Sequence, residues 1–243
     1  MNPICIRYCF QLNKQREEVF DVKLDPETLE IITPPIQNPP DWTRLEFHQC
    51  PHCPLQPADC RECPVAIRLA DIVQRFADIC SYDKLRLEVT TTDRHISQQT
   101  TAQQGLRSLA GLLMAASGCP HTLFLKPMAR FHLPLSTEAE TIFRATGMYL
   151  LAQYFVAQSG KQGDMQMDGL TTLYNRLHQV NLSTAERLRR SPQTDSPINA
   201  VSLLDLFTMT IPWVIEDKLE EIRPLFASYL PKEALAKPRC VAR

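Results

Sequence analysis

Apolar and polar residues alternate near the start of the chain, and this alternation predicts β-strands. The pattern covers residues 4–12 and, after a polar stretch, residues 20–24. A third strand is predicted over Leu29–Ile32 and another over residues 85–89. Pro64 opens an amphipathic helical pattern, and proline is well suited to the first turn of a helix. We therefore expect a small antiparallel sheet packed by one helix.

From about residue 97 onward, apolar residues recur at helical spacing. One stripe spans residues 106–116 and stops before Gly118, a residue type that commonly ends helices. Two further helical patterns cover residues 170–190 and 199–230. Pro212 is expected to break or kink the last of them, because proline disfavours helical backbone at the residue before it.

The strongest helical pattern covers residues 142–155 and is apolar along two adjacent rows. Residues 145–160 within and after it carry no charge. The polar side chains of Thr146, Gln153 and Gln158 interrupt this uncharged run. We therefore expect a buried core helix rather than a membrane span.

Potential metal ligands are most concentrated in the sequence around two pairs of cysteines. The segment reads His48-Gln-Cys50-Pro-His52-Cys53 and continues to Cys60-Arg-Glu-Cys63. Two Cys-x-x-Cys pairs separated by six residues are enough to surround one tetrahedral ion with four thiolates. The prediction is a zinc ion held by Cys50, Cys53, Cys60 and Cys63, with His48 and His52 as flanking groups. Such a site is structural, because four thiolates leave no open position for substrate or water.

Two other states of these cysteines stay open: an iron–sulfur cluster, or no metal with disulfides or free thiols. Compact ferredoxin spacing uses three cysteines at two-residue intervals, and this chain offers pairs instead. The first twenty residues contain no readable secretory signal, so we expect a cytoplasmic, reducing location. That location and the odd total of nine cysteines argue against a disulfide framework.

These patterns together predict an α+β fold. It has a small N-terminal antiparallel sheet with a four-cysteine metal site and one helix, followed by an α-helical C-terminal part. The predicted division places a β-rich metal-binding region at residues 1–96 and an α-helical region at residues 97–243.

A second group of chemically active residues lies on a segment interrupted by prolines. Its candidate catalytic residues are Cys119, His121, Arg130 and His132. The prolines make the segment too broken for a helix. If the segment doubles back, one of the histidines lowers the pKa of Cys119 and Arg130 holds an anionic group. The competing interpretation, which we favour, is a buried core cysteine beside unrelated histidines.

The remaining composition narrows the function only coarsely. A net charge of −1 gives no electrostatic argument for nucleic-acid binding, and GxGxxG, Walker and GxSxG motifs are missing. The favoured function is a cytosolic zinc-binding protein that acts as a partner-binding or regulatory module, with a protein partner and no membrane association. The alternatives are a thiol-dependent enzyme centred on Cys119 with His121 or His132, and an iron–sulfur redox protein.

Several runs of residues resemble an uncharacterised family of bacterial cytosolic proteins. The runs are FDVKLDPETLEI, PPDWTRLEFHQCPHCPL, CPVA, SGCPH, PMARFHLPL and ETIFRATGMYLLAQYF. They are spread over nearly the whole chain. The resemblance implies a bacterial origin and a cytosolic location, and it implies no particular mechanism.

Overall fold

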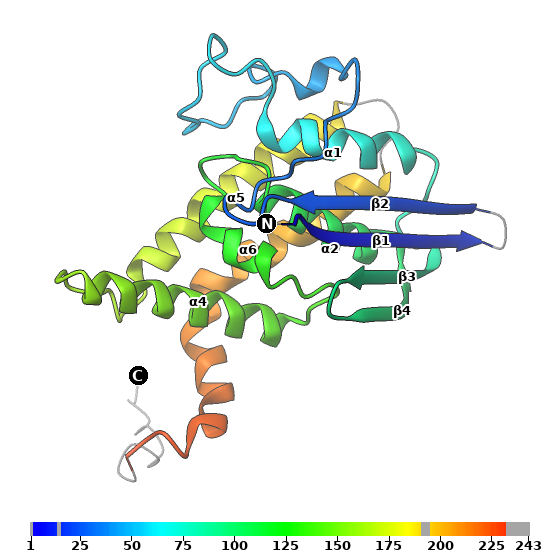
Figure 1. Ribbon diagram of the computed structural model, residues 1–243. Helices are drawn as coiled ribbons and strands as arrows, with labels where there is room; N and C mark the ends of the chain where they lie inside the picture. The colour runs from blue at the N-terminus through cyan, green and yellow to red at the C-terminus, as the bar shows by residue number, and fades with distance from the viewer. Residues whose placement is uncertain (1, 14–15, 191–194, 232–243) are drawn as a thin grey trace, which may run out of the picture.

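A computed structural model describes residues 2–13, 16–190 and 195–231, and it confirms the predicted α+β class (Figure 1). The strands are β1 (Ile4–Asn13), β2 (Arg16–Leu24), β3 (Lys84–Thr91) and β4 (His95–Thr101). The helices are α1 (Pro64–Arg75), α2 (Ala102–Ala115), α3 (Lys126–Arg130), α4 (Glu138–Gln158), α5 (Asp168–Arg189) and α6 (Asp195–Ile222). Short 3-10 helices cover Asp41–Thr43, Leu123–Leu125 and Arg223–Phe226.

The four strands form one antiparallel sheet in the order β2-β1-β3-β4. In its central register, Tyr8 pairs with Phe20 on one side and with Val89 on the other. These side chains all lie on the buried face, as the alternating pattern predicts, while Arg7 points to the exposed face. The sheet is therefore apolar on one side only and must be covered there.

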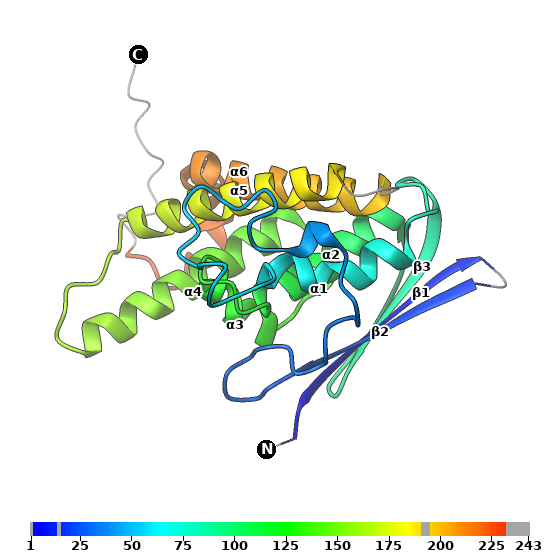
Figure 2. The same cartoon turned by 90° about the horizontal axis from the view of Figure 1, so that it is seen from above.

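Helices α1 and α2 both lie between the sheet and the antiparallel pair α5 and α6 (Figure 2). The sequence predicted one covering helix. Helix α2 comes so close to the sheet at Gly105 that an added Cβ would lie 2.9 Å from a ring carbon of Phe10. A larger residue at position 105 would push α2 away from the sheet. One hydrophobic core contains side chains of β1, β2, β3, α1, α2, α5 and α6.

Two strand predictions were wrong. Leu29–Ile32 forms only an isolated bridge between Ile31 and Leu24, because the preceding turn places Leu29 in the left-handed region at φ 58°. The Asp25 side chain holds this turn by accepting the N–H groups of Glu27 and Thr28. Strand β4 was missed because its residues are mostly polar and exposed.

The predicted division at residues 96 and 97 falls within β4. The separation into two regions stays a prediction, and residues 232–243 of the second region lie outside the described part of the chain. Helix α6 continues through Pro212, so of the two expected outcomes the break was wrong, and a kink stays a prediction. The proline-interrupted segment was expected to lack helix, yet it contains the short helix α3.

Helix α4 is not the buried core helix that the sequence predicted. Its first half packs Ile142 and Ala145 against α5, but from Leu151 onward most of its residues are exposed. Both views show its C-terminal half running out from the body on the side away from the sheet (Figures 1 and 2). In the described part of the chain, no helix is long and apolar enough to cross a membrane.

Residues 44–63, here named the cysteine loop, connect the first 3-10 helix to α1. The two ends of the loop are joined by backbone hydrogen bonds from Leu45 N to Arg61 O (2.9 Å) and from Cys63 N to Thr43 O (2.7 Å). The fully buried guanidinium of Arg187 on α5 donates to the carbonyl oxygen of Trp42, just before the loop, and to those of Arg44 and Leu45 at its start. Arg187 therefore fixes the loop to the helical layers.

This arrangement predicts that Arg187→Leu strongly destabilises the fold. The substitution leaves three carbonyl groups without their charged donor, and we expect a loss of about 3 kcal/mol or more in the free energy of unfolding. Urea denaturation measures the loss. The matched control is Arg189→Leu on the exposed side of the same helix, for which about 0.5 kcal/mol or less is expected. Equal losses in the two variants would contradict the role given to Arg187.

Candidate functional site

The cysteine loop brings its thiols close to Cys119 without arranging them around one point. Cys50, Cys53, Cys63 and Cys119 line one small cavity of about 10 Å³. The Cys60 thiol instead donates to the carbonyl oxygen of Glu62 at 3.0 Å. Among the described residues, no three Cys, His, Asp or Glu side chains are placed as a metal site. The predicted metal centre at Cys50, Cys53, Cys60 and Cys63 is thus not assembled in this arrangement, and its four cysteines are free thiols.

Burial favours the protonated form of three of these thiols, those of Cys50, Cys60 and Cys119. It raises the pKa of Cys50 and of Cys60, and the neighbouring thiol of Cys63 adds to both increases. Burial also raises the pKa of Cys119 to about 12. A nucleophilic cysteine needs the opposite shift, because the thiolate is the reactive form.

The other candidate catalytic residues are dispersed around Cys119. His121 stays nearby, but its ring lies tilted against the ring of His52, with 4.0 Å between centroids, and its Nε2 hydrogen-bonds the His52 carbonyl oxygen. Arg130 is exposed and lies over the ring of Phe131. His132 lines a different cavity from Cys119. The structure therefore does not bring Cys119, Arg130 and His132 into one site.

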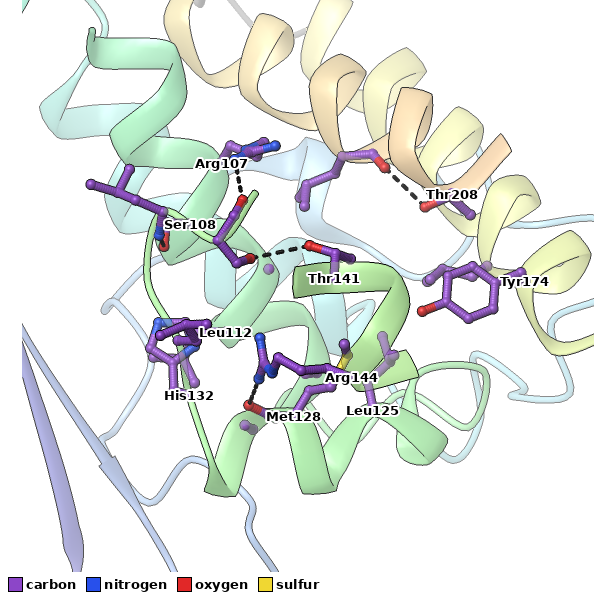
Figure 3. Close-up of a pocket in the computed structure, with 18 residues that line it drawn as sticks. Arg107, Ser108, Leu112, Leu125, Met128, His132, Thr141, Arg144, Tyr174 and Thr208 are labelled. Atoms are coloured by element: carbon purple, nitrogen blue, oxygen red, sulfur yellow. Dashed lines mark hydrogen bonds between the residues drawn. The ribbon is translucent and has the colours of Figure 1, made fainter. Parts of the chain in front are cut away.

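The cavity beside His132 is the site that sequence reasoning missed. It has a volume of about 150 Å³ and lies among α2, α3, α4, α5, α6 and the segment that precedes α4 (Figure 3). Its wall is largely apolar, built from residues such as Leu112, Leu125, Met128, Leu133, Leu177 and Leu204. The polar side chains in the wall are those of Arg107, Ser108, His132, Ser136, Thr141, Arg144, Tyr174 and Thr208. The described part of the wall contains no carboxylate.

Arg144 reaches this cavity from the first half of α4, where a capping box between Thr137 and Glu140 fixes the start of the helix. Its Nη2 donates to the carbonyl oxygens of Met128 (3.1 Å) and Phe131 (2.9 Å). Within the described residues, its Nε and Nη1 make no hydrogen bond. Burial lowers the pKa of Arg144, since removal from water disfavours the charged form.

Tyr174 and Arg107 complete the polar part of the wall. Tyr174 on α5 is buried, its hydroxyl points into the cavity, and no described residue accepts or donates a hydrogen bond there (Figure 3). Burial raises the pKa of Tyr174, and the Arg144 charge opposes this increase only in part. Arg107 on α2 donates to the Ser136 carbonyl oxygen at 3.2 Å, and burial lowers its pKa.

A buried polar network ties the cavity to the sheet. The Tyr8 hydroxyl on β1 hydrogen-bonds both His132 Nε2 and, at 3.0 Å, the hydroxyl of Ser108. Ser108 Oγ also accepts the backbone N–H of Leu135 at 3.0 Å. Burial lowers the pKa of His132 to about 3, with the charge of Arg144 acting in the same direction. His132 is therefore neutral at physiological pH, and it positions the segment before α4 against the sheet.

The depressed pKa of His132 predicts a loss of stability in mild acid. In the unfolded chain this histidine takes up a proton near pH 6.5, whereas in the folded chain it does so only near pH 3. The contribution of neutral His132 to the free energy of unfolding is therefore complete above pH 6.5 and declines as pH falls. Between about pH 7 and pH 5, the free energy of unfolding of the wild type should fall by about 2 kcal/mol more than that of His132→Gln. Urea denaturation at each pH tests this. The exposed-histidine variant His95→Gln should follow the wild type, and an identical pH profile for His132→Gln would refute the assignment.

Short sequence signals do not reveal the cavity. Arg107 and Arg144 are each a single charge inside an apolar helical pattern, and that is the one local sign they carry. The wall comes from segments more than a hundred residues apart, from Arg107 to Thr208, so only the tertiary fold assembles it.

Comparison with known proteins gives a family and no activity. Neither the search of curated proteins nor the search of solved structures returned a match. A family model described as a domain of unknown function, DUF6901, matches residues 6–227. That span contains the whole sheet except the first residues of β1, the cysteine loop, and the cavity. The chain belongs to the DUF6901 family.

Proposed function

We propose that this protein is a regulatory binding module that takes up a small organic anion with an apolar body in the cavity beside Arg144. The observation that carries the proposal is a half-buried guanidinium and a buried phenol hydroxyl on one largely apolar wall without a described carboxylate. Apolar pockets with a few convergent polar groups are the usual form of small-molecule sites.

The electrostatics favour an anion over a neutral ligand. Burial destabilises the charge of Arg144, as its lowered pKa indicates. The carbonyl oxygens of Met128 and Phe131 and the exposed carboxylate of Glu140, one turn earlier on α4, compensate only partly. A carboxylate would accept from the Nε and Nη1 groups, and Tyr174 would donate its hydroxyl to the same ligand. His132 adds no charge, since its lowered pKa keeps the ring neutral.

The volume of the cavity sets the size of the ligand. A cavity of about 150 Å³ lined by apolar side chains is known to accommodate a benzene molecule in another protein. A ligand of this size carries one acidic group and an aromatic ring or a short branched chain. Benzoate and 3-methylbutanoate represent these two shapes.

The proposal predicts that benzoate stabilises the protein and that benzyl alcohol, of similar size and without charge, does so much less. Free ligand at about one hundred times its Kd should add about 2.7 kcal/mol to the free energy of unfolding. Thermal unfolding at increasing benzoate concentration is the measurement. Arg144→Met should abolish the effect, and Tyr174→Phe should weaken binding by about threefold to tenfold.

The matched control for Arg144→Met is Arg130→Met, which removes an exposed arginine of neighbouring α3 and should leave the benzoate effect intact. Circular dichroism establishes that each variant is folded before binding is compared. The proposal fails if benzoate, 3-methylbutanoate and phenyl phosphate all leave the unfolding temperature of the wild type unchanged. It also fails if folded Arg144→Met responds to benzoate as the wild type does.

We also propose that the cysteine loop binds one structural zinc ion through Cys50, Cys53, Cys60 and Cys63. The spacing of the two pairs supports it, and so does the charge of Arg187. This guanidinium is fully buried and lines the same cavity as three of the thiols, and its hydrogen bonds to described residues all go to carbonyl oxygens. A zinc ion with four thiolates has a net charge of about −2, which would balance the buried cation. Binding requires the Cys60 thiol to turn away from the Glu62 carbonyl.

Protein purified under reducing conditions without chelator should therefore carry about one zinc per chain. Elemental analysis measures the zinc, and visible absorbance would reveal the iron–sulfur alternative. Cys60→Ser should lower metal content, whereas Cys5→Ser, which changes an exposed thiol on β1, should not. Metal-free wild type, or equal metal content in the two variants, would count against the site.

A further inference from the structure

One face of α4 exposes an apolar stripe made of Phe143, Gly147, Leu151, Tyr154 and Phe155. These positions follow one another around less than half of the helix circumference. Phe143 is 52% exposed, Leu151 and Tyr154 are each 55% exposed, and Phe155 is 60% exposed. The opposite face of the same helix carries the buried Ile142 and Ala145, so α4 is apolar on both sides.

The stripe is part of a well-anchored helix. The turn after α4 is held to it by a hydrogen bond from the Tyr149 hydroxyl to Asp164 (2.7 Å), and Asp164 N donates to the Gln153 side chain at 3.0 Å. The capping box at Thr137 fixes the other end. An exposed apolar surface on an ordered helix is typical of an interaction site.

We propose that the α4 stripe is the interface through which a second copy of this chain binds, with two α4 helices packed across a twofold axis. Such an interface places the same surface against itself, so a charged stripe would oppose like charges. Residues 145–160 of the sequence carry no charge, and the stripe itself is uncharged. Pairing of two copies through the stripe therefore brings no like charges together.

Gly147 at the middle of the stripe gives independent support. A Cβ added at this position meets no atom within 4 Å, so packing within a single copy does not require glycine. Its φ is not positive either, and glycine inside a helix is less stable than alanine. A second helix crossing at Gly147 can approach the backbone closely, which a larger side chain would prevent.

The exposed area is of the size that a stable pair requires. Four large side chains exposed by about half present about 100 Å² each, or about 400 Å² per copy. Pairing also covers Gly147 and the adjoining Leu150, so the two copies together bury about 1,000 Å². That value lies at the lower limit for a specific interface, and a dimer with a Kd in the micromolar range is expected.

Analytical ultracentrifugation of the full chain from about 1 to 100 µM tests the proposal. Wild type should pass from monomer to dimer over this range, and Leu151→Lys and Phe155→Lys should each raise the Kd about tenfold or more. Gly147→Leu should weaken the dimer although it adds apolar surface. Tyr82→Lys is the control, since Tyr82 is 78% exposed in the turn between α1 and β3, outside the α4 stripe, and should leave the Kd unchanged.

The substituted side chains are exposed, so the variants are expected to fold, and circular dichroism verifies this. The proposal is overturned if wild type stays monomeric over the whole range, or if a dimer persists unchanged in both lysine variants. Co-sedimentation with phosphatidylcholine vesicles is measured in parallel. Monomeric wild type that binds vesicles through the stripe would assign this face to a lipid surface and likewise overturn the dimer.

Discussion

The fold depends on arginine side chains that donate to backbone carbonyl oxygens of irregular segments. The chain has nineteen prolines, and each lacks the N–H that would otherwise pair with a carbonyl group. Proline-rich segments therefore hold more acceptors than donors, and buried acceptors need partners. Arginines on the helices supply them: Arg68 donates to Ile31 and Thr33, Arg107 to Ser136, Arg144 to Met128 and Phe131, and Arg187 to Trp42, Arg44 and Leu45.

The same arginines create the electrostatics of both proposed sites. A carbonyl oxygen satisfies an N–H group but brings no full negative charge, so a buried guanidinium held by carbonyls stays a net cation. Arg187 is such a cation beside the thiols, and Arg144 is one beside the apolar cavity. The hydrogen bonds that stabilise the loops therefore also favour negatively charged ligands at two places. Beside Arg187 the favoured group is a metal ion with its thiolates, and beside Arg144 it is an organic acid.

The sequence predicts those strands and helices that their own alternation or helical spacing of apolar residues identifies. Strands β1, β2 and β3 and the helix starting at Pro64 follow from their own periodicity. Strand β4 could not be predicted in this way, because it is a polar edge strand whose ladder with β3 supplies its stability. The predicted strand at Leu29–Ile32 was lost to a turn fixed by one carboxylate, that of Asp25.

The candidate site residues likewise differ in whether a local sequence pattern can predict them. The cysteine spacing is local, and three of the four thiols it singles out line one small cavity in the structure. Cys119 joins them only through the tertiary fold, and the Cys60 thiol instead donates to the Glu62 carbonyl oxygen. Arg144 and Tyr174 converge only because α4 packs on α5, and no spacing along the chain encodes that contact. The pairing of Cys119 with His132, which the sequence offered only as the alternative to a buried core cysteine, does not form, since Tyr8 on the sheet holds the histidine in another cavity.

Helix α4 links the proposed ligand cavity to the proposed interface. Adjacent residues face opposite environments, with Arg144 in the cavity wall and Phe143 in the exposed stripe. The helix is apolar on two faces, yet a single chain covers only one of them well, since on the other face the Phe143 ring meets Phe226 and the rest of the stripe stays exposed. This is why the sequence predicted a buried helix that the structure exposes in part. A second copy would bury the remaining face and so satisfy the whole apolar pattern. Binding at Arg144 and pairing at Phe143 would then act on one rigid helix, and any coupling between them must be reciprocal.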